Sequence, residues 1–122
     1  MKSFLSLTLL FLSLSTFATG SLYCSTPAKE YEFDGTTGRV PGNPLVGGIL
    51  VNTDEQTVVY PKSQIVGYWA MGDTVSFAII DANAEKLLYS VETKMVYNDE
   101  GPSSVGVLTL ASGEYFLITC EF

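Results

Sequence analysis

The stretch Gln64 to Asp81, QIVGYWAMGDTVSFAIID, decides the fold, and it predicts a β-hairpin. Apolar residues alternate along each arm, which is the pattern of a strand with one buried face. The turn between the arms contains Met71-Gly72. A two-residue loop at this point would set Trp69 opposite Thr74 and place the apolar residues of the two arms on opposite faces.

A longer loop, closed by Gly72 with a positive φ, removes this conflict. It pairs Trp69 with Asp73 and Gly67 with Val75. One face of the hairpin is then expected to be buried, and it consists of Ile65, Trp69, Val75, Phe77 and Ile79. Tyr68 is expected on the opposite face, together with Val66, Ala70, Thr74, Ser76 and Ala78.

The rest of the chain also predicts strands. Short alternating or apolar runs are expected to form strands at 29–34, 45–51, 57–60, 86–97, 105–110 and 114–121. Segments rich in Gly, Pro, Asn and Ser at 35–44 and 98–104 are expected to be loops. No stretch has a convincing helical period. We therefore predict an all-β domain of about eight short strands, either an antiparallel sandwich or a small closed barrel.

The first 20 residues have the pattern of a cleaved secretory signal. Lys2 precedes an apolar run that is too short to span a membrane, and Ala18-Thr19-Gly20 supplies small residues for cleavage. We expect cleavage after Gly20 or after Ala18, which leaves a single domain over 21–122 with no transmembrane segment. The mature protein is expected to be secreted or periplasmic.

The two cysteines of the chain, Cys24 and Cys120, lie near the two ends of this domain. An export signal and an even number of cysteines favour a disulfide. With only two cysteines the pairing is determined, and the bond would join the first strand to the last.

Charge and composition exclude several classes of function. Only one of the six basic residues lies in the signal, so the mature domain is acidic, with a net charge of about −8. Nucleic acids are improbable partners, because phosphate binding requires a basic patch. The chain has no histidine, which removes histidine-based nucleophile pairs and zinc sites. We expect no catalytic residues, no metal and no cofactor.

Two regions are candidate ligand-binding sites. Tyr68 and Ser76, on the predicted outer face of the hairpin, could form a shallow platform for a sugar or a protein edge. The loop 35–44 is the second candidate, through Arg39 and the hydroxyl groups of Thr36 and Thr37.

These features predict an exported, non-enzymatic module that binds a protein, a glycan or a small ligand. In plan alone, as an exported all-β domain of about 100 residues with a terminal disulfide, the chain is similar to the periplasmic lysozyme inhibitors. That similarity implies an alternative role as an inhibitor of a cell-wall hydrolase, with the loop 35–44 entering the cleft. A carboxylate-based hydrolase and a structural envelope subunit are further alternatives.

Overall fold

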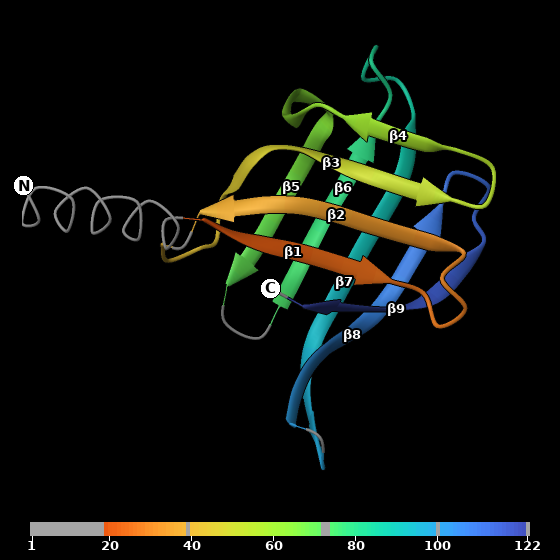
Figure 1. Cartoon of the computed structure of the whole chain (residues 1–122). Helices are drawn as coiled ribbons and strands as arrows, with labels where there is room; N and C mark the ends of the chain where they lie inside the picture. The colour runs from red at the N-terminus through yellow and green to blue at the C-terminus, as the bar shows by residue number, and fades with distance from the viewer. Residues whose placement is uncertain (1–18, 39, 72–73, 100, 122) are drawn as a thin grey trace, which may run out of the picture.

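The computed structural model describes residues 19–38, 40–71, 74–99 and 101–121. Within them, nine strands form one antiparallel sheet (Figure 1). A short 3₁₀ helix, η1 (Lys62–Gln64), lies between the fourth and fifth strands. The strands are β1 (Thr19–Ser25), β2 (Tyr31–Gly38), β3 (Leu45–Thr53), β4 (Thr57–Tyr60), β5 (Ile65–Met71), β6 (Thr74–Ile80), β7 (Leu87–Asn98), β8 (Gly101–Leu110) and β9 (Tyr115–Glu121).

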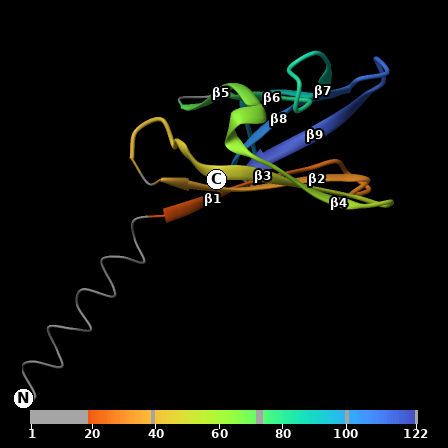
Figure 2. The same cartoon turned by 90° about the horizontal axis from the view of Figure 1, so that it is seen from above.

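The sheet is nearly closed and has the strand order β4-β3-β2-β1-β9-β8-β7-β6-β5. Figure 2 shows that it folds over itself, with β1 to β4 in one layer and β5 to β8 in the other. The predicted all-β class is therefore confirmed. Because every neighbour in the order is hydrogen-bonded, the architecture is a flattened barrel made from one sheet rather than two separate sheets.

The core lies between the two layers and follows the alternation of each strand. In β6, Val75, Phe77 and Ile79 are buried, whereas the residues between them are partly exposed. Phe33 of the opposite layer packs against Phe77, with 5.8 Å between ring centroids. Other fully buried apolar side chains come from both layers and include Leu22, Ile49, Val51, Val91, Leu108 and Ile118.

The predicted disulfide is confirmed. Cys24 of β1 and Cys120 of β9 are bonded, and they face each other directly in the strand pairing with a Cα–Cα distance of 4.0 Å. β1 and β9 pair over only three residue positions, so the disulfide reinforces the shortest seam of the sheet. It joins the first strand to the last, as expected from the positions of the cysteines.

Near the two edge strands, β4 and β5, hydrogen bonds other than strand pairing link the flanking segments across the open side of the sheet. The Gln64 side chain of η1 donates a 2.8 Å hydrogen bond to the carbonyl of Ile80. The Asn43 side chain donates to the carbonyl of Ala70 (2.8 Å), and the Tyr68 hydroxyl donates to the carbonyl of Asn43 (2.7 Å). The segment before β3 is thereby fastened to β5 at the open side of the barrel.

The expected register of the central hairpin is wrong. Ala70 pairs with Val75 and Trp69 with Ser76, but Val66 pairs with Ala78, so β5 carries one extra residue between these pairs. Such a bulge reverses which side chains face inward beyond it. Ile65 packs against the core as expected, whereas Trp69 lies on the outside with half of its surface exposed. Val75, Phe77 and Ile79 are buried as predicted.

Two predicted loops are shorter than expected. β2 continues to Gly38, because Thr36 and Thr37 pair with β1 on one side and Thr37 pairs with Leu45 on the other. β8 begins at Gly101 rather than after 104. These extensions lengthen predicted strands, whereas β1 is an additional one, so the described residues contain nine strands rather than about eight.

Residues 1–18 of the predicted signal lie outside the described part of the chain. Thr19 and Gly20 lie in β1 and pair with Gly38 and Thr37. Among the described residues, no helix is long and apolar enough to cross a membrane.

Candidate functional site

The outer face of β5 to β8, turned away from β1 to β4, carries two adjoining hollows. The larger has a volume of about 440 Å³, and the smaller one about 180 Å³. Ser76 and Glu92 line both, so we treat the two as one outer trough. The larger hollow is lined by Thr74, Ser76, Glu92, Thr93, Lys94, Val105 and Gly106. The smaller is lined by Val66, Gly67, Ser76, Phe77, Ala78, Ser90, Val91 and Glu92.

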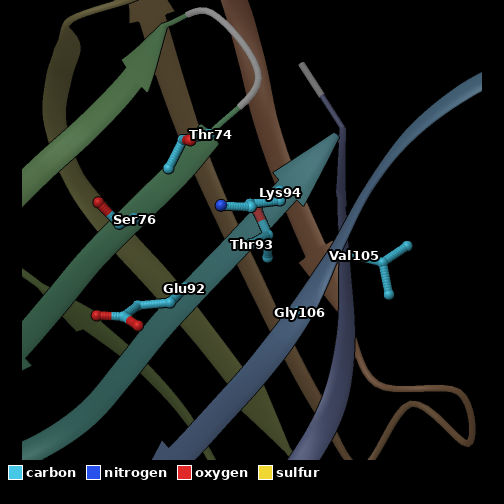
Figure 3. Close-up of a pocket in the computed structure, with 7 residues that line it drawn as sticks. All are labelled: Thr74, Ser76, Glu92, Thr93, Lys94, Val105 and Gly106. Atoms are coloured by element: carbon cyan, nitrogen blue, oxygen red, sulfur yellow. The ribbon is translucent and has the colours of Figure 1, made fainter. Parts of the chain in front are cut away.

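Strand pairing arranges the side chains of this outer face, those of the trough included, in rows across the sheet. Trp69 pairs with Ser76, Ser76 with Glu92, and Glu92 with Val107, so these four side chains form one row. The next row contains Thr74 and Lys94, which are also paired. Figure 3 shows Thr74, Ser76, Glu92 and Lys94 on the same side of β6 and β7.

The floor of the trough is polar and its edges are apolar. Hydroxyl groups and one charge of each sign come from the β6 and β7 residues, and Glu92 is the one carboxylate among the described lining residues. At the β5 edge, Val66, Trp69 and Met71 are each at least 41% exposed. The indole N–H of Trp69 donates to the carbonyl of Met71 (3.2 Å), which directs the ring along its own strand. An exposed aromatic ring beside hydrogen-bonding groups suits a ligand with apolar and hydroxyl-bearing faces.

Buried polar contacts beneath the trough hold β6, β7 and β8 together. The Thr93 hydroxyl, which is buried, donates to the carbonyl of Val75 (3.1 Å) and is hydrogen-bonded to the buried Ser104 hydroxyl. Gly106 pairs with Thr93, and a Cβ at position 106 would lie 1.8 Å from the carbonyl oxygen of Glu92. The floor of the trough therefore depends on a close approach of two backbones that only glycine permits here.

Of the first predicted pair, only Ser76 lies in the trough. Tyr68 is on the inner face, packed against the core, because the bulge at Gly67 reverses the facing of β5. Burial raises the pKa of its phenol, and its hydroxyl bonds the carbonyl of Asn43. The predicted platform of Tyr68 and Ser76 on one face is thus wrong. Ser76 does lie on the outer face of the hairpin, but the aromatic side chain beside it is Trp69 rather than Tyr68.

The residues of the second predicted site are not brought together. Thr36 is exposed on one face of β2, and Thr37 is buried on the other. Consecutive residues of a regular strand face opposite sides of the sheet. Because β2 extends through this segment, Thr36 and Thr37 point in opposite directions. Arg39 lies outside the described residues. Thr36 and Thr37 therefore do not form a joint hydroxyl site.

Ser90, Glu92 and Lys94 line the outer trough but were not among the predicted site residues. The alternation of 86–97 places them on the polar face of a strand, which is the signal that could have identified them. Connecting them to Ser76 needs the β6–β7 pairing, in which Ser76 is opposite Glu92 and Ala78 is opposite Ser90.

In the described part of the chain, no group of three or more His, Cys, Asp or Glu residues could hold a metal ion. Comparisons of the chain with protein-family models, with curated proteins and with solved structures give no match. The functional argument therefore depends on the chemistry of the surface.

Proposed function

We propose that this protein is an exported, non-enzymatic binding module that holds a glycan chain in the outer trough. The observation that carries the proposal is Trp69, half exposed on the outside of an edge strand and paired with Ser76, which lines both hollows. Aromatic side chains normally bury much of their surface, so an exposed tryptophan beside a hollow favours a ligand.

The chemistry of the trough supports a glycan over a purely apolar ligand. A sugar ring has an apolar face that can stack on indole and hydroxyl groups that can bond to serine, threonine and glutamate side chains. The trough is open and shallow, and two adjoining hollows would take successive units of a chain. The lack of histidine in the sequence and the single carboxylate among the described lining residues favour binding over hydrolysis, which requires a carboxylate pair.

A protein edge is the second candidate ligand, and exposed apolar side chains favour it. Val107 and Leu117 pair with each other beside the trough and are 44% and 56% exposed. They continue the row of Trp69, Ser76 and Glu92 toward β9. A partner that covered the whole row would bury more apolar surface than a single glycan chain.

Sedimentation with insoluble polysaccharides tests the glycan proposal. Purified oxidised protein is mixed with peptidoglycan, chitin or cellulose, and bound protein is measured in the pellet. We expect retention by at least one of these, and loss of most of it in Trp69→Ala. Tyr97→Ala is the matched control, because Tyr97 is an exposed aromatic residue (81%) whose strand partner is Pro102, whereas Trp69 is paired with Ser76, which lines both hollows. Equal behaviour of the two variants, or no retention by any polysaccharide, contradicts the proposal.

Export would follow from signal cleavage, and the position of β1 favours one of the two predicted points. Cleavage after Gly20 would remove Thr19 and Gly20 from the β1–β2 pairing, whereas cleavage after Ala18 would leave β1 whole. We therefore propose a mature protein that begins at Thr19.

A further inference from the structure

The turns β1–β2, β3–β4 and β8–β9 gather at one end of the barrel, on the right in Figure 1. Two hollows of about 240 and 380 Å³ open there. Both are lined by Tyr31, Gln56 and Tyr89, so they form one region, which we call the tyrosine mouth. It lies apart from the outer trough and has no lining residue in common with it.

Aromatic rings form a connected wall in the tyrosine mouth. The ring centroid of Tyr89 is 6.1 Å from that of Tyr31 and 6.2 Å from that of Tyr60. Phe33 packs edge-on against Tyr89 from the core side, at 5.4 Å. All three tyrosines are partly exposed, so their rings contact both the core and the hollows.

The rim of the mouth is negatively charged. Glu30, Asp54 and Glu55 line the smaller hollow, and none of the described residues lining either hollow is basic. Glu30 is held by a 2.9 Å hydrogen bond from the Thr26 hydroxyl. A bond from its own backbone amide, and then this one, lower the pKa of Glu30, which is therefore ionised at neutral pH.

Carboxylates and aromatic rings that line the same hollow are suited to a cation, since both the negative charge and the face of an aromatic ring attract positive charge. A metal ion does not fit, because the described acidic residues form no group that could hold one. Apolar side chains of Leu88, Leu110 and Ala111 line the larger hollow and would accept alkyl groups. We propose that the tyrosine mouth binds a small alkylated ammonium ion.

Titration of the purified oxidised protein with choline, followed by calorimetry and by NMR of the tyrosine rings, tests this proposal. The neutral isostere 3,3-dimethylbutanol is titrated in parallel, since it has the same shape without the charge. We expect saturable choline binding that shifts the Tyr31 and Tyr89 signals, and binding of the isostere that is about tenfold weaker. Equal affinity for both compounds, or no saturable binding of choline, overturns the proposal.

The charge of the rim is tested by the double variant Asp54→Asn, Glu55→Gln, which changes two exposed residues. We expect choline affinity to fall about three- to tenfold. Glu121→Gln is the control, because Glu121 is exposed and lines neither hollow. An unchanged affinity in the double variant contradicts the assigned site.

The ammonium group could belong to a free solute or to a phosphatidylcholine headgroup. Flotation of the protein with phosphatidylcholine vesicles identifies the headgroup as the source. Binding of soluble choline without flotation identifies a free solute.

Discussion

Trp69 lies on the outside of the sheet because of the conformation of Gly67, two residues earlier. Gly67 has a φ of +62°, a left-handed conformation that costs other residues about 1–2 kcal/mol. The extra residue at this point turns Tyr68 and Ala70 inward and leaves Trp69 beside Ser76. At the scale of single residues, one backbone angle therefore decides which aromatic side chain lies on the outer face of the sheet.

Quenching of fluorescence by acrylamide measures this placement, since Trp69 is the only tryptophan. Because half of the side chain is exposed, we expect the quenching constant in the folded protein to be about half of that in the unfolded chain. Strong protection of the indole in the folded state would contradict this placement. It would mean that Trp69 is buried, as the alternation of Trp69 with Ile65 in the sequence predicts.

Tyr89 makes the stability of the tyrosine mouth sensitive to high pH. Burial, then the nearby Tyr60 and Tyr31 hydroxyls, raise the pKa of Tyr89 to about 12. The folded state thus favours the neutral phenol. The neutral phenol of Tyr89 therefore contributes to the free energy of unfolding. This contribution is fully present below about pH 10, the ordinary pKa of tyrosine, and is lost as the pH rises toward 12.

Chemical denaturation at a series of pH values checks this direction. The free energy of unfolding is expected to fall between about pH 10 and pH 12, and to fall less steeply in Tyr89→Phe. A parallel dependence in the protein and the variant would show that Tyr89 is not responsible.

At the scale of elements, the β7–β8 pair supports the floor of the outer trough. Gly106→Ala would place a Cβ 1.8 Å from the Glu92 carbonyl oxygen and 2.6 Å from the Thr93 Cα, so the strands must separate. We expect a loss of about 1–3 kcal/mol in the free energy of unfolding, by analogy with overpacked interiors. Val107→Ala, at an exposed position next to it, is expected to cost less than about 0.5 kcal/mol. Similar small losses in both variants would contradict the close approach.

Element types were predictable where local alternation is regular. The segments 57–60, 86–97 and 114–121 lie close to the observed β4, β7 and β9, since one buried face produces the pattern directly. The bulge in β5 was not predictable from alternation, because Gly67 has no side chain to mark a face. The same limit applies to the candidate site. The alternation of the sequence predicted that Ser76 lies on the outer face of β6, but the residues of β5 and β7 that lie beside it are determined by the register of strand pairing.

The tyrosine mouth shows a further reason why sites are missed. Tyr31, Tyr60 and Tyr89 come from β2, β4 and β7, so only the folded sheet brings them together. From the sequence, each of these tyrosines is predicted only to be an ordinary strand residue with an apolar ring. Nothing local distinguishes a tyrosine in the core from one at the end of the barrel.

At the scale of the whole molecule, the terminal disulfide holds the barrel closed between β1 and β9. It joins residues 96 positions apart, so it restricts nearly the whole unfolded chain. We expect the double variant Cys24→Ala, Cys120→Ala to lose about 2–5 kcal/mol of unfolding free energy. Thr119→Ala, an exposed neighbour of Cys120, is the control. A loss no larger than that of the control would mean that strand pairing alone closes the seam.

The central claim is that the outer trough is the ligand-binding surface, and affinity capture tests it most directly. Three oxidised forms are immobilised: the unchanged protein, Ser76→Arg in the trough, and Thr57→Arg at an exposed position on β4. Each is exposed to envelope extract and culture fluid of the producing cell, and the eluates are analysed for saccharides and proteins. The claim predicts a component that the unchanged protein and Thr57→Arg retain and that Ser76→Arg loses, with equal thermal unfolding of all three. Retention of the same components by Ser76→Arg, or no retention by any form, would contradict it.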